Sequence, residues 1–273
     1  MSADSARLPH DMELEEDAHS FSLKDHVVII SGAAQGIGRE VARHFAAAGA
    51  VPIIVDINLE KAKSVEAEII ASGGRAFAQY ADISDPASLA QMVDAVLARF
   101  GKIDCLINNG AIFASLGKRP FDEIPLAEWE QVLKVNITGT YLSVCAVLPA
   151  MKAAGRGRII NISSAAVALG APNYLHYVTS KSAIIGMTNA MAREVGGFGI
   201  NVNAIRPGAV ATEVDRTVNP TVQGRAIWAE RQCVPRGQVP ADMVGLMMFL
   251  ASPASRFISG QTIACDGGLT HSS

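Results

Sequence analysis

Tyr177 and Lys181, in the stretch NYLHYVTSKSAIIG at residues 173–186, are the pair whose types and spacing most directly suggest chemistry. Side chains four positions apart lie on one face of a helix, so the phenol and the ammonium group would be neighbours. A free tyrosine has a pKa of ~10 and is a poor base near neutral pH. A nearby ammonium group favours the phenolate, which would make the pair a general acid and base. A solvated lysine beside an amphipathic tyrosine would give the same pattern.

A glycine-rich segment, SGAAQGIG at residues 31–38, is the second chemical signal. It lies between a short apolar run and a helical pattern, which is the context of a phosphate-binding turn. Gly32 would permit the tight turn, Gly36 would let the backbone approach a pyrophosphate, and Gly38 would allow close packing of the helix. The spacing G-x-x-x-G-x-G departs from the general dinucleotide fingerprint, G-x-G-x-x-G.

Asp56 ends the next apolar run, within the interval of ~20 residues at which a ribose-binding acid follows such a turn. A carboxylate there would accept hydrogen bonds from both ribose hydroxyls and repel a 2′-phosphate. Neither Gln35 nor Ile57 offers the positive charge that the extra phosphate of NADP requires. The sequence therefore predicts NAD as the cofactor, with an ordinary turn residue as the alternative interpretation of Asp56.

These residues need a scaffold, and the sequence predicts one of alternating strands and helices. The expected strands are HVVIISG, VPIIVD, RAFAQYAD, IDCLINN, GRIINISS, INVNAIRPG and GQTIACDGG. Helical patterns lie between them, including 126–154, 177–195 and 241–251. Such alternation is typical of right-handed βαβ units and of a parallel sheet covered on both faces. We therefore expect an α/β protein: a single-domain, doubly wound Rossmann fold with seven parallel strands over residues 23–273.

Composition argues against several other classes of protein. The chain has 273 residues, of which 49% are hydrophobic, and its net charge is −3 without a basic stripe that would suggest nucleic acid. No apolar run approaches ~18 residues, so we expect no membrane partner. The four cysteines show neither metal nor disulfide spacing, which predicts a cytoplasmic protein without a metal site.

Residues 1–22 are acidic and lack the segments of a signal peptide. We interpret them as a disordered tail that the fold does not need. An arm that docks on a neighbouring subunit is the alternative.

Several motifs, taken in order, make this chain resemble the short-chain dehydrogenase/reductase family from about Leu23 to Gly268. They are SGAAQGIG, ADI with Asp82, NNGA at 108–111, VNITGTY with Asn136, NISSA with Ser164, YVTSK, RPGAVAT and DGG. One departure is N-N-G-A where the family usually has N-N-A-G. We expect this swap to move the position at which the backbone can adopt a positive φ without steric strain, and so to reshape the following loop.

The resemblance implies an NAD-dependent alcohol dehydrogenase or ketoreductase. Tyr177 would be the acid and base, and Lys181 would lower its pKa and hold the nicotinamide ribose. Ser164, thirteen residues before Tyr177, would orient the substrate oxygen, with Ser163 as the alternative. Asn136 would anchor a water in a proton relay, or else merely bend its helix. The cofactor contacts implied are Gly32, Gln35, Gly36, Ile37, Gly38, Asp56, Asp82, Ile83, Asn109, Gly110, Tyr177, Lys181, Pro207, Gly208, Val210 and Thr212.

Substrate choice should depend on residues 214–239, which form a lid in this family. Ile227 and Trp228 favour a hydrophobic or cyclic secondary alcohol or ketone, although arginines in the lid could meet an anionic group or face water. Further pocket walls are expected from Phe113, Ala166, Val167 and Tyr174.

Other functions remain as alternatives: a polyol or sugar dehydrogenase, an NADPH-dependent carbonyl reductase, and a non-catalytic dinucleotide-binding protein. An enoyl reductase is disfavoured because those relatives have a wider Tyr–Lys spacing. The resemblance also implies a homotetramer built on helices 126–154 and 177–195 and on the C-terminal strand.

Overall fold

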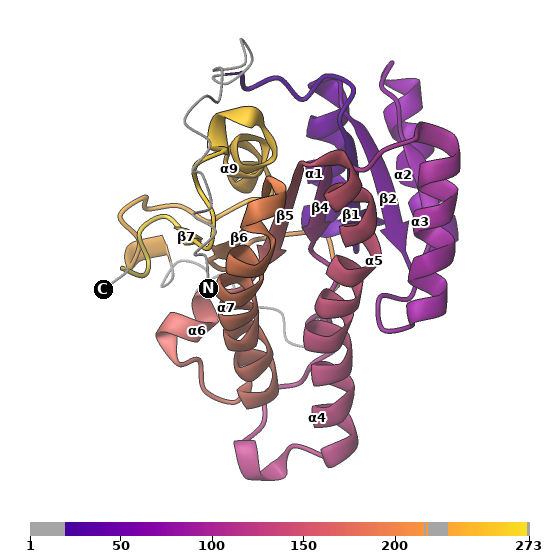
Figure 1. Ribbon diagram of the computed structural model, residues 1–273. Helices are drawn as coiled ribbons and strands as arrows, with labels where there is room; N and C mark the ends of the chain where they lie inside the picture. The colour runs from indigo at the N-terminus through magenta and orange to yellow at the C-terminus, as the bar shows by residue number, and fades with distance from the viewer. Residues whose placement is uncertain (1–19, 216, 218–228, 272–273) are drawn as a thin grey trace, which may run out of the picture.

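A parallel sheet forms the centre of the computed structural model, which describes residues 20–215, 217 and 229–271 (Figure 1). Its strands are β1 (Val27–Ser31), β2 (Val51–Asp56), β3 (Phe77–Tyr80), β4 (Cys105–Asn108), β5 (Gly157–Ile162), β6 (Ile200–Pro207) and β7 (Thr262–Cys265). The seven strands lie in the order β3-β2-β1-β4-β5-β6-β7, and each pairs with its neighbours in parallel. The expected doubly wound α/β fold is therefore confirmed.

Helices cover both faces of this sheet. The main ones are α1 (Gly36–Ala47), α2 (Leu59–Ala71), α3 (Pro86–Phe100), α4 (Leu126–Leu133), α5 (Gly139–Ala154), α6 (Ala165–Leu169), α7 (Leu175–Val195) and α9 (Ala241–Ala251). One apolar core joins α1, α2 and α9 to the sheet, and a second joins α3, α5 and α7 to its other face. Successive side chains of a strand point to opposite faces of the sheet, so a strand that is covered on both faces is apolar throughout. In β1, Val28 and Ile30 pack in the first core, and Val27 and Ile29 pack in the second.

The helix ends follow from local sequence. The Asp85 side chain accepts a hydrogen bond from the Ala87 N–H and caps α3, with Pro86 in its first turn. Gly101 ends this helix with a φ of 72°, a left-handed conformation that glycine adopts without steric cost. The Asn58 side chain caps α2 in the same manner by accepting from the Lys61 N–H.

A π-helical turn, Lys134–Thr138, joins α4 to α5 in one continuous helix over residues 126–154. Within the described part of the chain, this is the one helix long and apolar enough to cross a membrane by length and composition. It packs against α3, α7 and β5.

The chain is already docked on the fold at Ser20. The Ala254 N–H donates to the Ser20 carbonyl at 3.1 Å, and the Phe21 ring lies 6.0 Å from the Phe249 ring of α9. Within the expected tail of residues 1–22, Ser20 and Phe21 thus contact α9 and the 3-10 turn that follows it. Residues 1–19 of the expected tail lie outside the described residues.

Candidate active site

A cavity of about 640 Å³ opens at the carboxyl ends of the strands, where the strand order reverses between β1 and β4. Doubly wound sheets bind their ligands at this place, and the volume suits a small-molecule site. Six strands each deliver a lining residue at or just after their carboxyl ends: Gly32, Asp56, Asp82, Asn109, Ser164 and Pro207. All of the expected catalytic and cofactor-binding residues line this cavity except Gly38 and Asn136.

The glycine turn fits against the turn after β4 so closely that side chains are excluded. A Cβ atom on Gly38 would lie 2.4 Å from the Gly32 carbonyl oxygen, and one on Gly32 would lie 2.7 Å from the Gly110 Cα. The Asn109 amide donates to the carbonyls of Ser31 and Gly32 and holds the two turns together. A backbone cradle of this kind, at the start of α1, suits the pyrophosphate of a dinucleotide.

The glycine in the swapped N-N-G-A order serves close packing and not a left-handed backbone conformation. Gly110 does not adopt a positive φ, so the expectation of a shifted left-handed position is wrong. A Cβ atom there would lie 3.3 Å from the Gly32 nitrogen and the Ser31 Oγ. Because glycine has no Cβ, Gly110 can lie this close to the turn after β1.

Asp56 both shapes the glycine turn and faces the cavity. Its carboxylate accepts hydrogen bonds from the N–H groups of Ala34, at 3.2 Å, and Asn58, at 2.9 Å. A carboxylate has about four acceptor sites, so these bonds leave capacity for ribose hydroxyls. The turn interpretation and the ribose interpretation of Asp56 are thus compatible.

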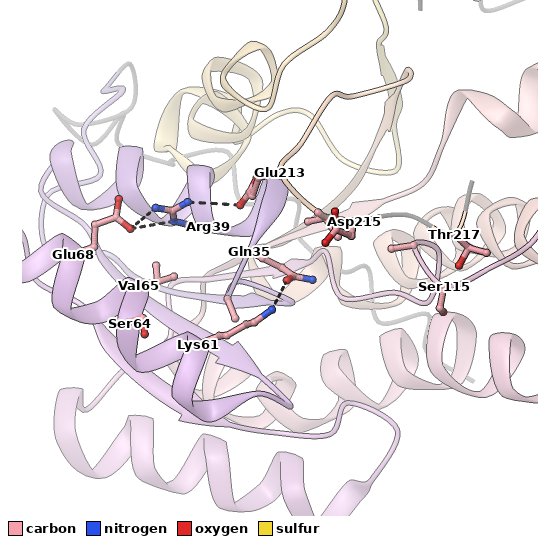
Figure 2. A pocket seen from close by; sticks show the side chains of 13 residues that line it. Gln35, Arg39, Lys61, Ser64, Val65, Glu68, Ser115, Glu213, Asp215 and Thr217 are labelled. Atoms are coloured by element: carbon pink, nitrogen blue, oxygen red, sulfur yellow. Dashed lines mark hydrogen bonds and ion pairs between the residues drawn. The ribbon is translucent and has the colours of Figure 1, made fainter. Parts of the chain in front are cut away.

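A hollow of about 790 Å³ adjoins the cavity beside the glycine turn, and Figure 2 shows the side chains that line it. The Lys61 ammonium donates to the Gln35 side-chain oxygen at 3.2 Å. Arg39 pairs with Glu68 at 2.8 Å and with Glu213 at 3.6 Å. Together with Asp215, these make three carboxylates and two cations around the hollow.

Glu213 is a site residue that the motifs did not reveal. The Gly36 N–H donates to its carboxylate at 2.9 Å, so this acid lies at the N-terminus of α1, where anions are stabilised. Burial opposes ionisation of Glu213, but the Gly36 hydrogen bond and the Arg39 guanidinium hold its pKa below the usual value. The signal available in the sequence was its position directly after Thr212 and just before the lid of residues 214–239.

Tyr177 and Lys181 are neighbours on α7, and both are buried at the cavity wall. The Lys181 Nζ lies 5.9 Å from the centroid of the Tyr177 ring and donates to the Ile162 carbonyl at 2.7 Å. Burial removes water from the ammonium group and lowers the pKa of Lys181 to about 8. The geometry thus places one positive charge beside the phenol.

The two serines after β5 have different surroundings. Ser163 is buried and donates to the Lys181 carbonyl at 2.8 Å, which ties β5 to α7. Ser164 accepts from the Ala166 N–H at 3.2 Å and caps α6. Its hydroxyl hydrogen remains available for donation toward the cavity. The surroundings favour Ser164 as the substrate-facing serine.

Asn136 is buried in the π-helical turn, and its amide is used for contacts within the protein. It accepts from the Ile112 N–H at 2.8 Å and donates to the Ile112 carbonyl and to the Ser180 Oγ. The side chain thus ties the loop after β4 to α7. The expected contact with a relay water stays a prediction.

Aromatic side chains form the substrate end of the cavity. The ring centroid of Phe113 lies 4.6 Å from that of Tyr177 and 6.0 Å from that of Tyr174. Ala166 also lines the wall, but the expected Val167 does not; Leu169 of the same short helix takes part instead. The lid residues Ile227 and Trp228 lie outside the described residues.

Comparison with known protein sequences gives a consistent family. A family model described as "Enoyl-(Acyl carrier protein) reductase" matches residues 32–270. A D-threitol dehydrogenase of Mycolicibacterium smegmatis is 35% identical over 92% of this chain and 95% of its own. A 7alpha-hydroxysteroid dehydrogenase of Escherichia coli is 33% identical over 92% of this chain and 97% of its own.

Solved structures agree with the sequence relatives. A gluconate 5-dehydrogenase from Burkholderia cenocepacia, in complex with NADP and tartrate, is 32% identical with a TM-score of 0.87, covering 94% of this chain and 99% of that one. A 3-oxoacyl-[acyl-carrier protein] reductase from Brucella melitensis with bound NAD is 34% identical with a TM-score of 0.83, covering 93% and 95%. The chain therefore belongs to the short-chain dehydrogenase/reductase family of oxidoreductases.

Proposed function

We propose that this protein is an NAD-dependent dehydrogenase that interconverts a secondary alcohol, cyclic or hydrophobic, and its ketone. One observation carries the proposal: Tyr177, Lys181 and Ser164 line the same cavity as the glycine turn. When bound there, the dinucleotide supplies the carbon that accepts or returns the hydride.

The chain's own residues fit such a cofactor from end to end. The turn with Gly32, Gln35, Gly36 and Ile37 would hold the pyrophosphate at the start of α1, where it would displace the Glu213 carboxylate from the Gly36 N–H, and Gly38 would let the helix pack closely. Asp56 would bind the adenosine ribose, with the adenine beside Asp82, Ile83, Asn109 and Gly110. Lys181 and the segment with Pro207, Gly208, Val210 and Thr212 would hold the nicotinamide end.

Tyr177 would carry the proton in this reaction. In oxidation its phenolate oxygen takes the hydroxyl proton as the hydride leaves the carbinol carbon, and in reduction the phenol returns it. The Lys181 charge stabilises the phenolate form. Ser164 donates a hydrogen bond to the substrate oxygen and fixes its position.

The charges near the ribose end support NAD over NADP. A 2′-phosphate would meet Asp56 and, in the adjoining hollow, the three carboxylates of Glu68, Glu213 and Asp215 against the two cations of Arg39 and Lys61. Arg39 is already paired with two of these acids. Because the solved relatives carry either nucleotide, the proposal rests on these charges of the chain itself.

The walls of the cavity support a cyclic or hydrophobic alcohol. Phe113, Tyr174 and Ala166 present aromatic and aliphatic surface next to Tyr177. The steroid dehydrogenase among the relatives fits this interpretation, whereas the threitol dehydrogenase favours the second candidate, a polyol.

We also propose a cytoplasmic homotetramer. On α5, Tyr141 is half exposed and Cys145 is exposed. An apolar hollow of about 450 Å³ lies between α3 and α5 on the same side. Apolar surface of this kind supports a contact with another subunit. Light scattering of the purified protein tests this, with a mass four times that of the chain as the expected result.

The direct test of the function is a rate comparison. Wild type and Tyr177→Phe would be assayed with cyclic alcohols, aryl carbinols and polyols in the presence of NAD or NADP, and the formation of reduced cofactor would be followed. We expect turnover with NAD that Tyr177→Phe abolishes while its affinity for NADH stays within about twofold. Turnover that survives in Tyr177→Phe would remove this residue from the mechanism.

An Asp56→Ala variant in the same assay tests the cofactor assignment. Loss of the carboxylate should shift the NAD/NADP ratio of kcat/KM toward NADP by about tenfold or more. Glu60→Ala, an exposed acid on α2 outside both cavities, is the matched control. An unchanged ratio in Asp56→Ala would refute the ribose role.

A further inference from the structure

We propose that Lys118 forms an anion-binding subsite at the substrate end of the cavity, so that the preferred substrate is a secondary alcohol or ketone that also carries a carboxylate. The inference rests on the proposed function for the position of the carbinol, and it adds the chemical class of the substrate.

A row of aromatic rings leads from the catalytic phenol to this lysine. Phe113 contacts Tyr177, with ring centroids 4.6 Å apart, and Tyr174 lies 6.0 Å beyond Phe113. The Lys118 Nζ lies 5.9 Å from the centroid of the Tyr174 ring. Tyr177 and Lys118 line the same cavity, so a ligand with its oxygen at Tyr177 would extend along apolar surface toward an ammonium group.

The distribution of charge around the cavity singles out this lysine. Among the described lining residues, the carboxylates are Asp56 and Asp82, both at the nucleotide end. Lys181 is buried and donates to the Ile162 carbonyl. Lys118 forms no ion pair with any described residue, in contrast to Arg119, which pairs with Glu128 at 3.4 Å. One uncompensated positive charge therefore remains at the substrate end.

The chemistry of the site suits a carboxylate. An ammonium group offers three donors to an anion, and the neighbouring apolar wall would strengthen the attraction by excluding water. A single positive charge matches a singly charged group. Because Lys118 itself is exposed, the expected gain is modest, about tenfold in affinity.

The test uses two ring compounds that cannot react, cyclohexanecarboxylate and cyclohexanecarboxamide. Their dissociation constants from the complex of the enzyme with NADH would be measured by calorimetry at low salt. We expect the carboxylate to bind about tenfold more tightly than the amide in the wild type and in Lys118→Arg. In Lys118→Met the two constants should agree within about twofold, and in Lys118→Glu the order should reverse.

Lys134→Met is the matched control, because Lys134 is an exposed lysine of the same region that does not line the cavity. This variant should keep the wild-type preference, and NADH affinity verifies the fold of every variant. Equal binding of the two compounds by the wild type, or a preference that survives Lys118→Met, would overturn the proposal. Absence of Tyr177-dependent turnover, with the preference intact, would count against the proposed reaction alone.

Discussion

Lys181 is the residue at which burial and charge conflict most strongly. The residue is 5% exposed, and its ammonium group donates a hydrogen bond to the Ile162 carbonyl. Burial disfavours the charged form, which lowers the pKa of Lys181 to about 8 in the folded chain. The folded state thus releases this proton more easily than the unfolded state does.

The consequence is a specific dependence of stability on pH. Below pH ~8 both states hold the proton and the folded chain bears the full cost of a buried charge. As the pH rises from ~8 to ~10.5, the folded chain loses the proton first, so this cost is relieved by up to about 3 kcal/mol. We therefore predict that the unfolding free energy of wild type rises relative to that of Lys181→Met over this range. Denaturant unfolding of the apoprotein at several pH values measures it, and a flat difference would show that Lys181 has an ordinary pKa.

The two serines after β5 give a second prediction at the residue scale. Ser164→Ala should reduce kcat by about 100-fold or more, because a donor to the reacting oxygen is lost, with little change in NADH affinity. Ser163→Ala should act mainly on stability, by about 1 kcal/mol, through its lost bond to the Lys181 carbonyl. Steady-state kinetics and denaturant unfolding of both variants separate the two roles. The reverse pattern would exchange the assignments.

At the scale of the elements, the strands and helix ends could be predicted because their causes are local. The apolar runs of the strands and the Asp85 cap of α3 are legible in a few consecutive residues. The contacts of Lys61 with Gln35 and of Glu213 with Gly36 could not be predicted, because each joins residues that are distant in the sequence. His176 illustrates the same limit: it is fully buried and hydrogen-bonded to Glu128 of α4, which lies 48 positions earlier in the sequence.

The interlocked turns after β1 and β4 lead to a prediction about two glycines. A Cβ at Gly38 would overlap the Gly32 carbonyl, which is backbone and cannot move aside, whereas a Cβ at Gly110 would be tight by only a few tenths of an ångström. Gly38→Ala should therefore abolish NADH binding or destabilise the fold by several kcal/mol, and Gly110→Ala should cost about 1 kcal/mol or less. Thermal unfolding and NADH titration measure both effects. Equal effects would mean that the backbone at Gly32 can shift to accommodate a methyl group on Gly38.

At the scale of the whole molecule, the first described residues contribute to the fold through α9. A chain that begins at Leu23 loses the Ser20 carbonyl bond to Ala254 and the contact of Phe21 with Phe249. We predict that it melts about 2–4 °C lower than a chain that begins at Ser20, which corresponds to about 1 kcal/mol. The full chain and the chain beginning at Ser20 should melt together. A large loss on removing residues 1–19 alone would assign them a structural role.

The convergence of six strand ends on one cavity has a consequence for evolution. In the proposed site, residues that follow β1, β2, β3, β4 and β6 hold the nucleotide, whereas the substrate end is built from Phe113 and Lys118 in the loop after β4 and from the segment between β5 and α7. We therefore expect substitutions at Phe113, Lys118 or Tyr174 to change the substrate preference without disturbing the sheet or the proposed nucleotide site. If the nucleotide-binding residues are retained while the substrate-binding residues diverge, relatives that are about a third identical to this chain can be named for a tetritol and for a steroid.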